Sequence, residues 1–223
     1  MSTVIPNFKT IRIDHPKLRK FAPLVCAGSQ PIKVAMSSKQ RAAGCCYWNV
    51  AEEVRTNGGV AVYGWQIVYW PKRFMEAMHH AIWRMPNGTL LDVTEKYSSD
   101  SVESYSVFII DDSIPIDLDK PNYVQSKHFA FKNDPNVTSF ITAYRNKNVA
   151  EIAMASLLYK YGYRNEGPKA RAKGVSLDPS FFKFPPEFHA ESASIGNALN
   201  KAMNQLGSAI NLIHAADKAS TST

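Results

Sequence analysis

Cysteine is scarce in this 223-residue chain, which contains only Cys26, Cys45 and Cys46. An odd number with two neighbours is a poor disulfide framework, so the sequence predicts an intracellular, cytoplasmic protein in a reducing compartment. The chain also lacks Cys-x-x-Cys pairs and the Cys–His spacing of zinc fingers, which argues against a structural zinc site. We expect no metal and no cofactor, and a thiol without a structural role becomes a candidate nucleophile.

Long apolar runs are missing as well. No apolar stretch reaches the roughly 18 residues that a membrane-spanning helix needs. The longest candidate, residues 59–70, is interrupted by Gly64 and Gln66. The N-terminal segment holds Pro6 and Asp14 in place of the apolar centre of a secretory signal. We therefore expect neither a membrane span nor a secretory signal.

The excess of positive charge is spread along the chain. There are 26 Lys and Arg against 19 Asp and Glu, a net charge of +7. A basic surface can attract nucleic acid, but no stripe of basic residues alternates with aromatic ones as in nucleic-acid-binding segments. Nucleic acid is therefore not an expected partner. With 45% hydrophobic and 20% charged residues, the composition is that of a globular protein.

The first part of the chain combines one helix with several strands. Residues 1–35, rich in proline, are predicted to form a loop-rich lead-in with short strand-like runs at residues 10–13 and 32–36. A helix is predicted from about Cys45 to the Asn-Gly-Gly segment at 57–59, which ends it. Apolar and aromatic runs then predict strands at residues 60–70, 76–84, 89–94 and 102–110. This order predicts an α+β fold in which a cysteine-bearing helix packs on an antiparallel sheet.

Helical spacing dominates the second part. Apolar residues recur at helical intervals after Asp134, with a predicted break near residues 146–148. A segment rich in proline, glycine and basic residues predicts a loop at about 162–186. We therefore expect a core with its lead-in at residues 1–131, followed by a helical extension at residues 132–223.

The last predicted helix, residues 187–216, carries a heptad-like seam. Its apolar residues step alternately by four and three positions: Ile195, Leu199, Ala202, Leu206, Ala209 and Ile213. Such a seam suits either packing on the helix's own domain or assembly of a homo-oligomer through residues 195–213. We favour packing on its own domain.

A hairpin is predicted at the Met-Pro-Asn-Gly segment of residues 85–88. If the loop has three residues and starts at the proline, His80 and Asp92 become diagonal neighbours on one face of the sheet. A two-residue turn at the Asn-Gly pair would place His79 on the face of Asp92 instead. Proline suits the second position of a type I turn, which favours the three-residue loop and His80.

These residues suggest a nucleophilic site. Cys45 and Cys46 stand at the predicted start of a helix, where the helix dipole favours the reactive thiolate. With His80 and Asp92, such a thiol forms a plausible Cys-His-Asp triad. The histidine would take the thiol proton, and the aspartate would orient the ring and set its tautomer.

This layout resembles the papain-like superfamily, in particular its transglutaminase-type and NlpC/P60-type members. Many of these carry a cysteine on a helix, then His-Ala-Trp on a strand, a turn with glycine, and Asp-Pro-Thr on the next strand. The corresponding segments here are His80-Ala81-Ile82-Trp83, Asn87-Gly88 and Asp92-Val93-Thr94. Bacterial members also carry Gly-Trp or Gly-Tyr in the preceding strand, as Gly64-Trp65 does here. The resemblance spans about residues 40–97 and departs at Ile82 and Val93, where Trp and Pro are frequent. It implies a papain-like core.

The resemblance also suggests roles for residues near the cysteine pair. Cys46 and Asn49 match a Cys-x-x-Asn pattern, which makes Cys46 the nucleophile and leaves Cys45 pointing toward the core. Gln40 lies six residues before Cys46, where papain-type enzymes carry an oxyanion-hole glutamine, although a surface glutamine is the alternative. Asn49 would contact local backbone or substrate.

Three functions remain open from the sequence. The first is a cysteine hydrolase or acyltransferase that acts on an amide or ester of a protein or peptide through a thioester, as a peptidase, amidase, deamidase or transglutaminase-like enzyme. The second is a catalytically silent papain-like protein that binds a protein partner through its surface and C-terminal helix. The third is a metal-dependent hydrolase that uses His79, His80 and Asp92. It is disfavoured, because neighbouring residues of a strand point to opposite faces.

Overall fold

A long antiparallel ribbon forms the centre of the fold. The computed structural model describes residues 6–96 and 103–219. In it, strands β3 (Val60–Trp70) and β4 (Phe74–Arg84) pair along their whole length. Both strands are rich in aromatic and other apolar residues, which suit a pleated and largely buried surface.

The ribbon is part of a closed sheet, because β3 also pairs with β6, β4 with β5, and β2 with both β5 and β6. We call the ring of β2, β3, β4, β5 and β6 the closed sheet. Strands β1 and β7 extend it at β3 and β4. The bounds of these strands are β1 Lys9–Thr10, β2 Ile32–Arg41, β5 Leu90–Thr94, β6 Tyr105–Ile110 and β7 Lys127–Ala130. The start of the strand predicted at 102–110 lies outside the described residues.

The predicted loop-rich lead-in at residues 1–35 is wrong in one place, because it contains a helix. Helix α1 (Pro16–Val25) forms there, capped by the His15 side chain, which accepts a hydrogen bond from the Lys17 amide. The Pro23 inside this helix obscured its pattern. The strand-like run predicted at residues 32–36 is confirmed as the first part of β2. This strand pairs with β5 in parallel, so the sheet is not purely antiparallel as predicted. Val34 alone is fully buried in β2, which leaves too weak an alternation to predict a central strand.

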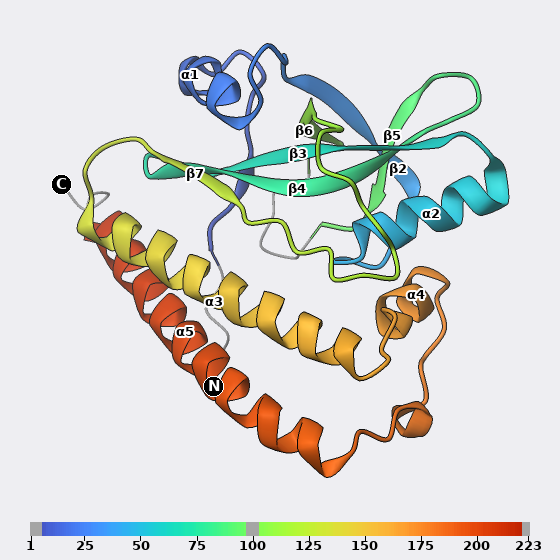
Figure 1. Cartoon of the computed structure of the whole chain (residues 1–223). Helices are drawn as coiled ribbons and strands as arrows, with labels where there is room; N and C mark the ends of the chain where they lie inside the picture. The colour runs from blue at the N-terminus through green and yellow to red at the C-terminus, as the bar shows by residue number, and fades with distance from the viewer. Residues whose placement is uncertain (1–5, 97–102, 220–223) are drawn as a thin grey trace.

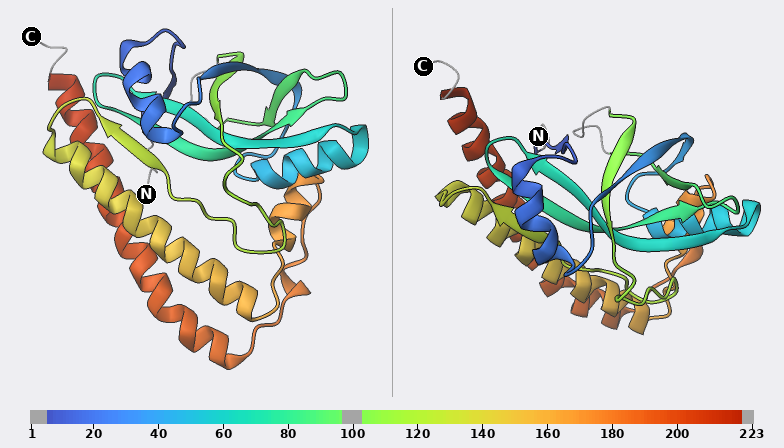
Figure 2. Two further views of the ribbon diagram at one scale, coloured as in Figure 1. Left: turned by 45° about the horizontal axis from the view of Figure 1, so that its top comes forward. Right: turned by 90° about the horizontal axis from the view of Figure 1, so that it is seen from above.

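Helices cover the sheet on two sides (Figures 1 and 2). Helix α1 packs on one side through a core that includes Phe21, Trp65 and Ile67. On the other side lie the two long helices α3 (Pro135–Lys160) and α5 (Pro186–Ala219). The interior of the closed sheet has its own apolar cluster, made of Val34, Val62, Ile82 and Phe108. The structure is therefore α+β, with helices at the C-terminal end as predicted.

The predicted break in the first C-terminal helix is wrong, because α3 runs without interruption through residues 146–148. Asn148 is tolerated inside the helix because its side-chain amide donates to Glu151, one turn further along. The predicted loop at 162–186 also contains structure, namely helix α4 (Glu166–Ala172) and the short 3-10 helix η1 (Pro179–Phe181). Among the described residues, no helix combines the length and apolar character needed to cross a membrane.

The C-terminal helices share a core with the sheet. Trp70 and Phe74 of the ribbon pack with Phe140 of α3 and Ile210 of α5. Ala202, Leu206, Ala209 and Ile213 of the predicted seam are buried in the structure. Residues 202–213 of the seam therefore pack on the protein's own chain, whereas Ile195 and Leu199 are half-buried. The division into domains at residues 131 and 132 falls between β7 and α3 and stays a prediction.

Leu206→Asp is expected to destabilise the fold by more than about 3 kcal/mol, because it buries an unpaired carboxylate in the core beneath α5. Urea unfolding followed by circular dichroism measures this. Met203→Asp is the matched control, since Met203 is 45% exposed on the same helix and should cost less than about 1 kcal/mol. If Leu206→Asp lowers the mass seen by light scattering and leaves the urea midpoint unchanged, the seam serves assembly instead.

Candidate active site

The β4–β5 hairpin adopts the predicted three-residue loop. Gly88 has a φ of 87°, its amide donates to the Met85 carbonyl at 2.9 Å, and the Met85 amide donates to the Thr89 carbonyl at 2.9 Å. Trp83 lies opposite Leu91, which is the register predicted for this loop. This register confirms that His80, and not His79, shares a face with Asp92.

His80 and Asp92 form a buried pair. The two atoms His80 Nε2 and Asp92 Oδ1 lie 3.0 Å apart, and the residues are 7% and 0% exposed. The Thr94 amide donates to the same oxygen at 3.2 Å. Burial opposes ionisation of Asp92, but the charge of His80 and several hydrogen bonds hold its pKa below the ordinary value. Asp92 is therefore an ionised, fixed acceptor for His80.

Two further polar residues hold Asp92 from inside the closed sheet. The Ser106 hydroxyl donates to Asp92 Oδ2 at 2.8 Å, and the Gln66 side-chain amide donates to Ser106 Oγ at 3.1 Å. Neither residue was predicted as part of the site. The available signal was Gln66 itself, a polar residue that interrupts an otherwise apolar strand.

Gly64 of β3 lies opposite His80 on β4. It also faces β6, where a Cβ atom would come within 2.1 Å of the Ile109 carbonyl oxygen. Any side chain at this position would push β6 away, so glycine permits the close approach of β3 and β6 beside the histidine.

Cys46 is the first residue of helix α2 (Cys46–Asn57), which begins at the predicted place and ends at Gly58. The helix packs on β4 and β5 through a cluster that includes Tyr47, Val50 and Ala81. This packing holds the cysteine in the lining of a cleft that His80 also lines. Because Nε2 of His80 is engaged by Asp92, Nδ1 is the nitrogen left for the thiol.

The His80 ring stands between Cys46 and Asp92. Burial opposes its protonation, but the nearby charges of Asp92 and Cys46 and the hydrogen bond with Asp92 outweigh that effect. The pKa of His80 is consequently raised well above its ordinary value of 6.5. The structure thus brings together Cys46, His80 and Asp92, the three residues predicted for a triad.

The alternate residues Cys45 and His79 lie outside this arrangement. Cys45 is fully buried, its Sγ lies 3.5 Å from the Ala43 carbonyl oxygen, and burial raises the pKa of its thiol. His79 is hydrogen-bonded through Nδ1 to the Tyr47 hydroxyl at 2.7 Å and stands edge-on to Trp65. Burial lowers the pKa of His79 to about 4, so this ring is neutral near neutral pH.

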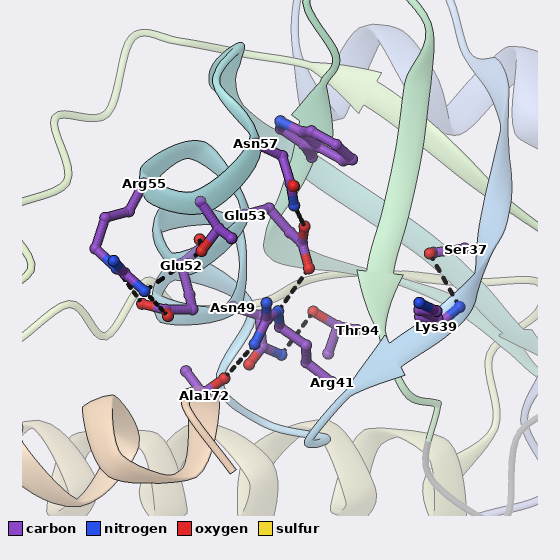
Figure 3. A network of polar contacts seen from close by, with 12 residues as sticks. Ser37, Lys39, Arg41, Asn49, Glu52, Glu53, Arg55, Asn57, Thr94 and Ala172 are labelled. Carbon is purple, nitrogen blue, oxygen red and sulfur yellow. Dashed lines mark hydrogen bonds and ion pairs between the residues drawn. The ribbon is translucent and has the colours of Figure 1, made fainter.

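The two predicted supporting residues have other positions. Gln40 is exposed in strand β2 and does not line the cleft, so it cannot serve as the predicted oxyanion-hole donor. Its exposed position near the end of β2 fits the stated alternative of a surface glutamine. Asn49 is fully buried, and its amide donates to the Ala42 carbonyl at 2.8 Å and to Thr94 Oγ1 at 3.0 Å (Figure 3). It therefore ties α2 to the end of β5, which is the local role considered for it.

The cleft has a volume of about 560 Å³. It is lined by Cys46 of α2, by residues of the sheet that include Gln66 and His80, and by residues of α3 and α4. Aromatic and apolar side chains such as Trp48 and Tyr144 alternate with polar ones. A concave, mixed lining of this size suits a ligand as large as a short peptide segment.

Within the described residues, no group of three or more His, Cys, Asp or Glu side chains is placed to hold a metal ion. His79 and His80 take different partners, Tyr47 and Asp92, as expected for neighbours on a strand. The residues proposed for a metal-dependent hydrolase therefore do not converge.

Comparisons with protein-family models, with curated proteins and with solved structures found no match to this chain. The chemistry of the cleft must therefore be argued from its own geometry.

Proposed function

We propose that the protein is a papain-like, cysteine-dependent hydrolase or acyltransferase that acts on an amide or ester through a thioester intermediate. The observation that supports it most is the His80 ring, which is hydrogen-bonded to Asp92 and lines an open cleft together with Cys46. A buried carboxylate is stable here because the histidine and two other donors satisfy it.

In the proposed reaction, Cys46 loses its proton to Nδ1 of His80 and attacks the substrate carbonyl carbon. The S–C bond forms, and the carbonyl oxygen becomes an oxyanion. Amide N–H groups in the first turn of α2 have no acceptor within the helix, so they can donate to this oxyanion. The protonated His80 then gives its proton to the leaving amine or alcohol, and a thioester remains.

Water or an amine resolves the thioester. His80 Nδ1 removes a proton from the incoming nucleophile, the new C–O or C–N bond forms, and Cys46 leaves with the proton returned. Asp92 stays ionised and stabilises the imidazolium in both half-reactions. Hydrolysis and transfer share every step but the choice of nucleophile.

Reaction of Cys46 with iodoacetamide is expected to remain fast as the pH falls from 8 to 6. The reason is that a protonated His80 beside the thiol favours the thiolate. A free cysteine in solution serves as the reference, and it slows by about tenfold per pH unit below about 8.5. Peptide mapping after timed labelling measures the rate at each site, and buried Cys45 should remain unlabelled.

His80→Ala provides the control, because it should restore the pH dependence of a free thiol at Cys46. If Cys46 already follows the free cysteine in the wild-type protein, the thiol is not activated. The chain is then better described by the second function considered, a catalytically silent binding protein.

A further inference from the structure

The cations that line the cleft differ in how they are engaged by other described residues. Lys147 Nζ contacts Glu151 at 2.6 Å, and Lys96 Nζ is held by backbone carbonyl oxygens, including that of Tyr105 at 2.9 Å. Within the described residues, by contrast, the Arg171 guanidinium makes no hydrogen bond or ion pair. Arg171 is exposed, it lines the same cleft as Cys46, and its helix α4 packs next to α2.

Helix α4, which carries Arg171, is anchored on several sides. Arg41 at the end of β2 donates to the Ala172 carbonyl at 2.7 Å and forms an ion pair with Glu53 of α2 at 2.7 Å (Figure 3). The Asn165 side chain donates to the Leu118 carbonyl at 2.9 Å, and Lys169 pairs with Asp119. These contacts hold the backbone of Arg171 in place while its guanidinium stays unengaged.

Helix α3, which lines the cleft together with α4, offers an unused acceptor. Asn148 of α3 is 9% exposed, and its Nδ2 donates to Glu151 Oε2 at 3.2 Å. A carboxylate only accepts hydrogen bonds, so this contact fixes which end of the amide carries the oxygen. The Oδ1 atom of Asn148 is buried without a partner. Buried carbonyl oxygens are normally satisfied, so a donor from a bound ligand would complete this one.

We propose that the cleft binds an acidic peptide segment, with a carboxylate on Arg171 and a peptide N–H on Asn148 Oδ1. The inference rests on the proposed function, since the acyl group of this peptide would lie at Cys46. A guanidinium recognises a carboxylate through two parallel hydrogen bonds, which gives direction as well as charge. The substrate class is therefore a peptide with an acidic residue near the reacting carbonyl group.

Pairs of tripeptidyl chloromethyl ketones test the proposal. The two members of a pair carry glutamate or glutamine at one position and are otherwise identical. One pair is made for each of the three residue positions, counted from the reactive carbon. Cys46 displaces chloride in this reaction, so labelling rates follow from mass spectrometry. At one position or more, the glutamate probe should react about three- to tenfold faster at low salt, and the preference should shrink as salt is added.

Arg171→Gln is expected to bring the glutamate-to-glutamine rate ratio close to one. Lys173→Gln is the matched control: it removes the same charge just after the same helix, at a position that does not line the cleft, so the preference should persist. Asn148→Leu should slow the glutamate and glutamine probes alike. Thermal melting checks that this buried position tolerates leucine. If Asn148→Leu does not fold, Asn148→Ala is used in its place.

The outcomes separate two failures. If iodoacetamide labels Cys46 with the pH behaviour of an activated thiol but glutamate and glutamine probes react equally at all positions, the acidic-peptide proposal is wrong and the proposed function stands. A preference that survives in Arg171→Gln overturns the role of Arg171. If Cys46 shows no activation even toward iodoacetamide, the proposed function itself fails.

Discussion

Cys46→Ala and His80→Ala are each expected to reduce acyl transfer by about 10³-fold or more, and the double variant should be no worse than either single one. The thiol and the imidazole act as one unit, because neither can start the reaction without the other. The measurement is the burst of p-nitrophenolate released when p-nitrophenyl acetate acylates the thiol, followed by the steady rate of deacylation.

Two controls accompany this experiment. Cys26→Ala removes a half-buried thiol that bonds Ser29 away from the cleft, and its burst should match that of the wild-type protein. His79→Ala removes the neighbouring ring on the same strand and should retain most of the burst. A burst that survives His80→Ala but disappears in His79→Ala would mean that the wrong histidine has been assigned as the base.

Asp92→Asn is expected to keep the fold and lower the same acylation rate by about 10²- to 10⁴-fold. The carboxylate accepts a hydrogen bond from His80 Nε2 and stabilises the imidazolium, whereas a carboxamide can donate and hold the ring in the wrong tautomer. Asp111→Asn is the matched control. Asp111 is also buried and ionised, but it accepts from Trp65 Nε1 at 2.8 Å on the side of His79. Equal losses in both variants would indicate a general effect on stability.

Asp92→Asn should also change how the stability of the fold depends on pH. The raised pKa of His80 means that its pairing stabilises the fold fully below pH 6.5, and this stabilisation is lost as the pH rises through the folded pKa. The lowered pKa of Asp92 has the opposite direction, with full stabilisation above pH 3.8 and a loss as the pH falls through its folded value. The pair therefore contributes most to stability between about pH 4 and 6.5. Outside this window, the urea midpoint of Asp92→Asn should vary less with pH than that of the wild-type protein.

Local patterns predicted the central part of the site well. The turn chemistry at residues 85–88 set the register of one hairpin, and the register determined which histidine faces Asp92. The Asn-Gly-Gly segment and the cysteine pair likewise marked the ends of α2. In each case the interacting residues are close in sequence, so a short segment contains all the information.

Contacts between distant segments escaped prediction. Ser106 reaches Asp92 because β6 pairs with both β2 and β3, a pairing that no local pattern reveals. Gln40 matched a spacing along the sequence, but its place is set by the strand pairing of β2 with β5. The polar wall of α3 and α4 could not be foreseen either, because the sequence does not show where a helix packs.

The approach of β3 and β6 beside Gly64 has a consequence for the order of events during folding. The closed sheet forms only after a chain segment more than forty residues beyond Gly64 has arrived, since Gly64 pairs with Ile110. Closing so long a loop is slow compared with forming a hairpin. His80 and Asp92 can meet early within their hairpin, yet Ser106 joins them only with β6. A nascent chain would therefore contain Cys46 for some time before Ser106 and the rest of the closed sheet are in place.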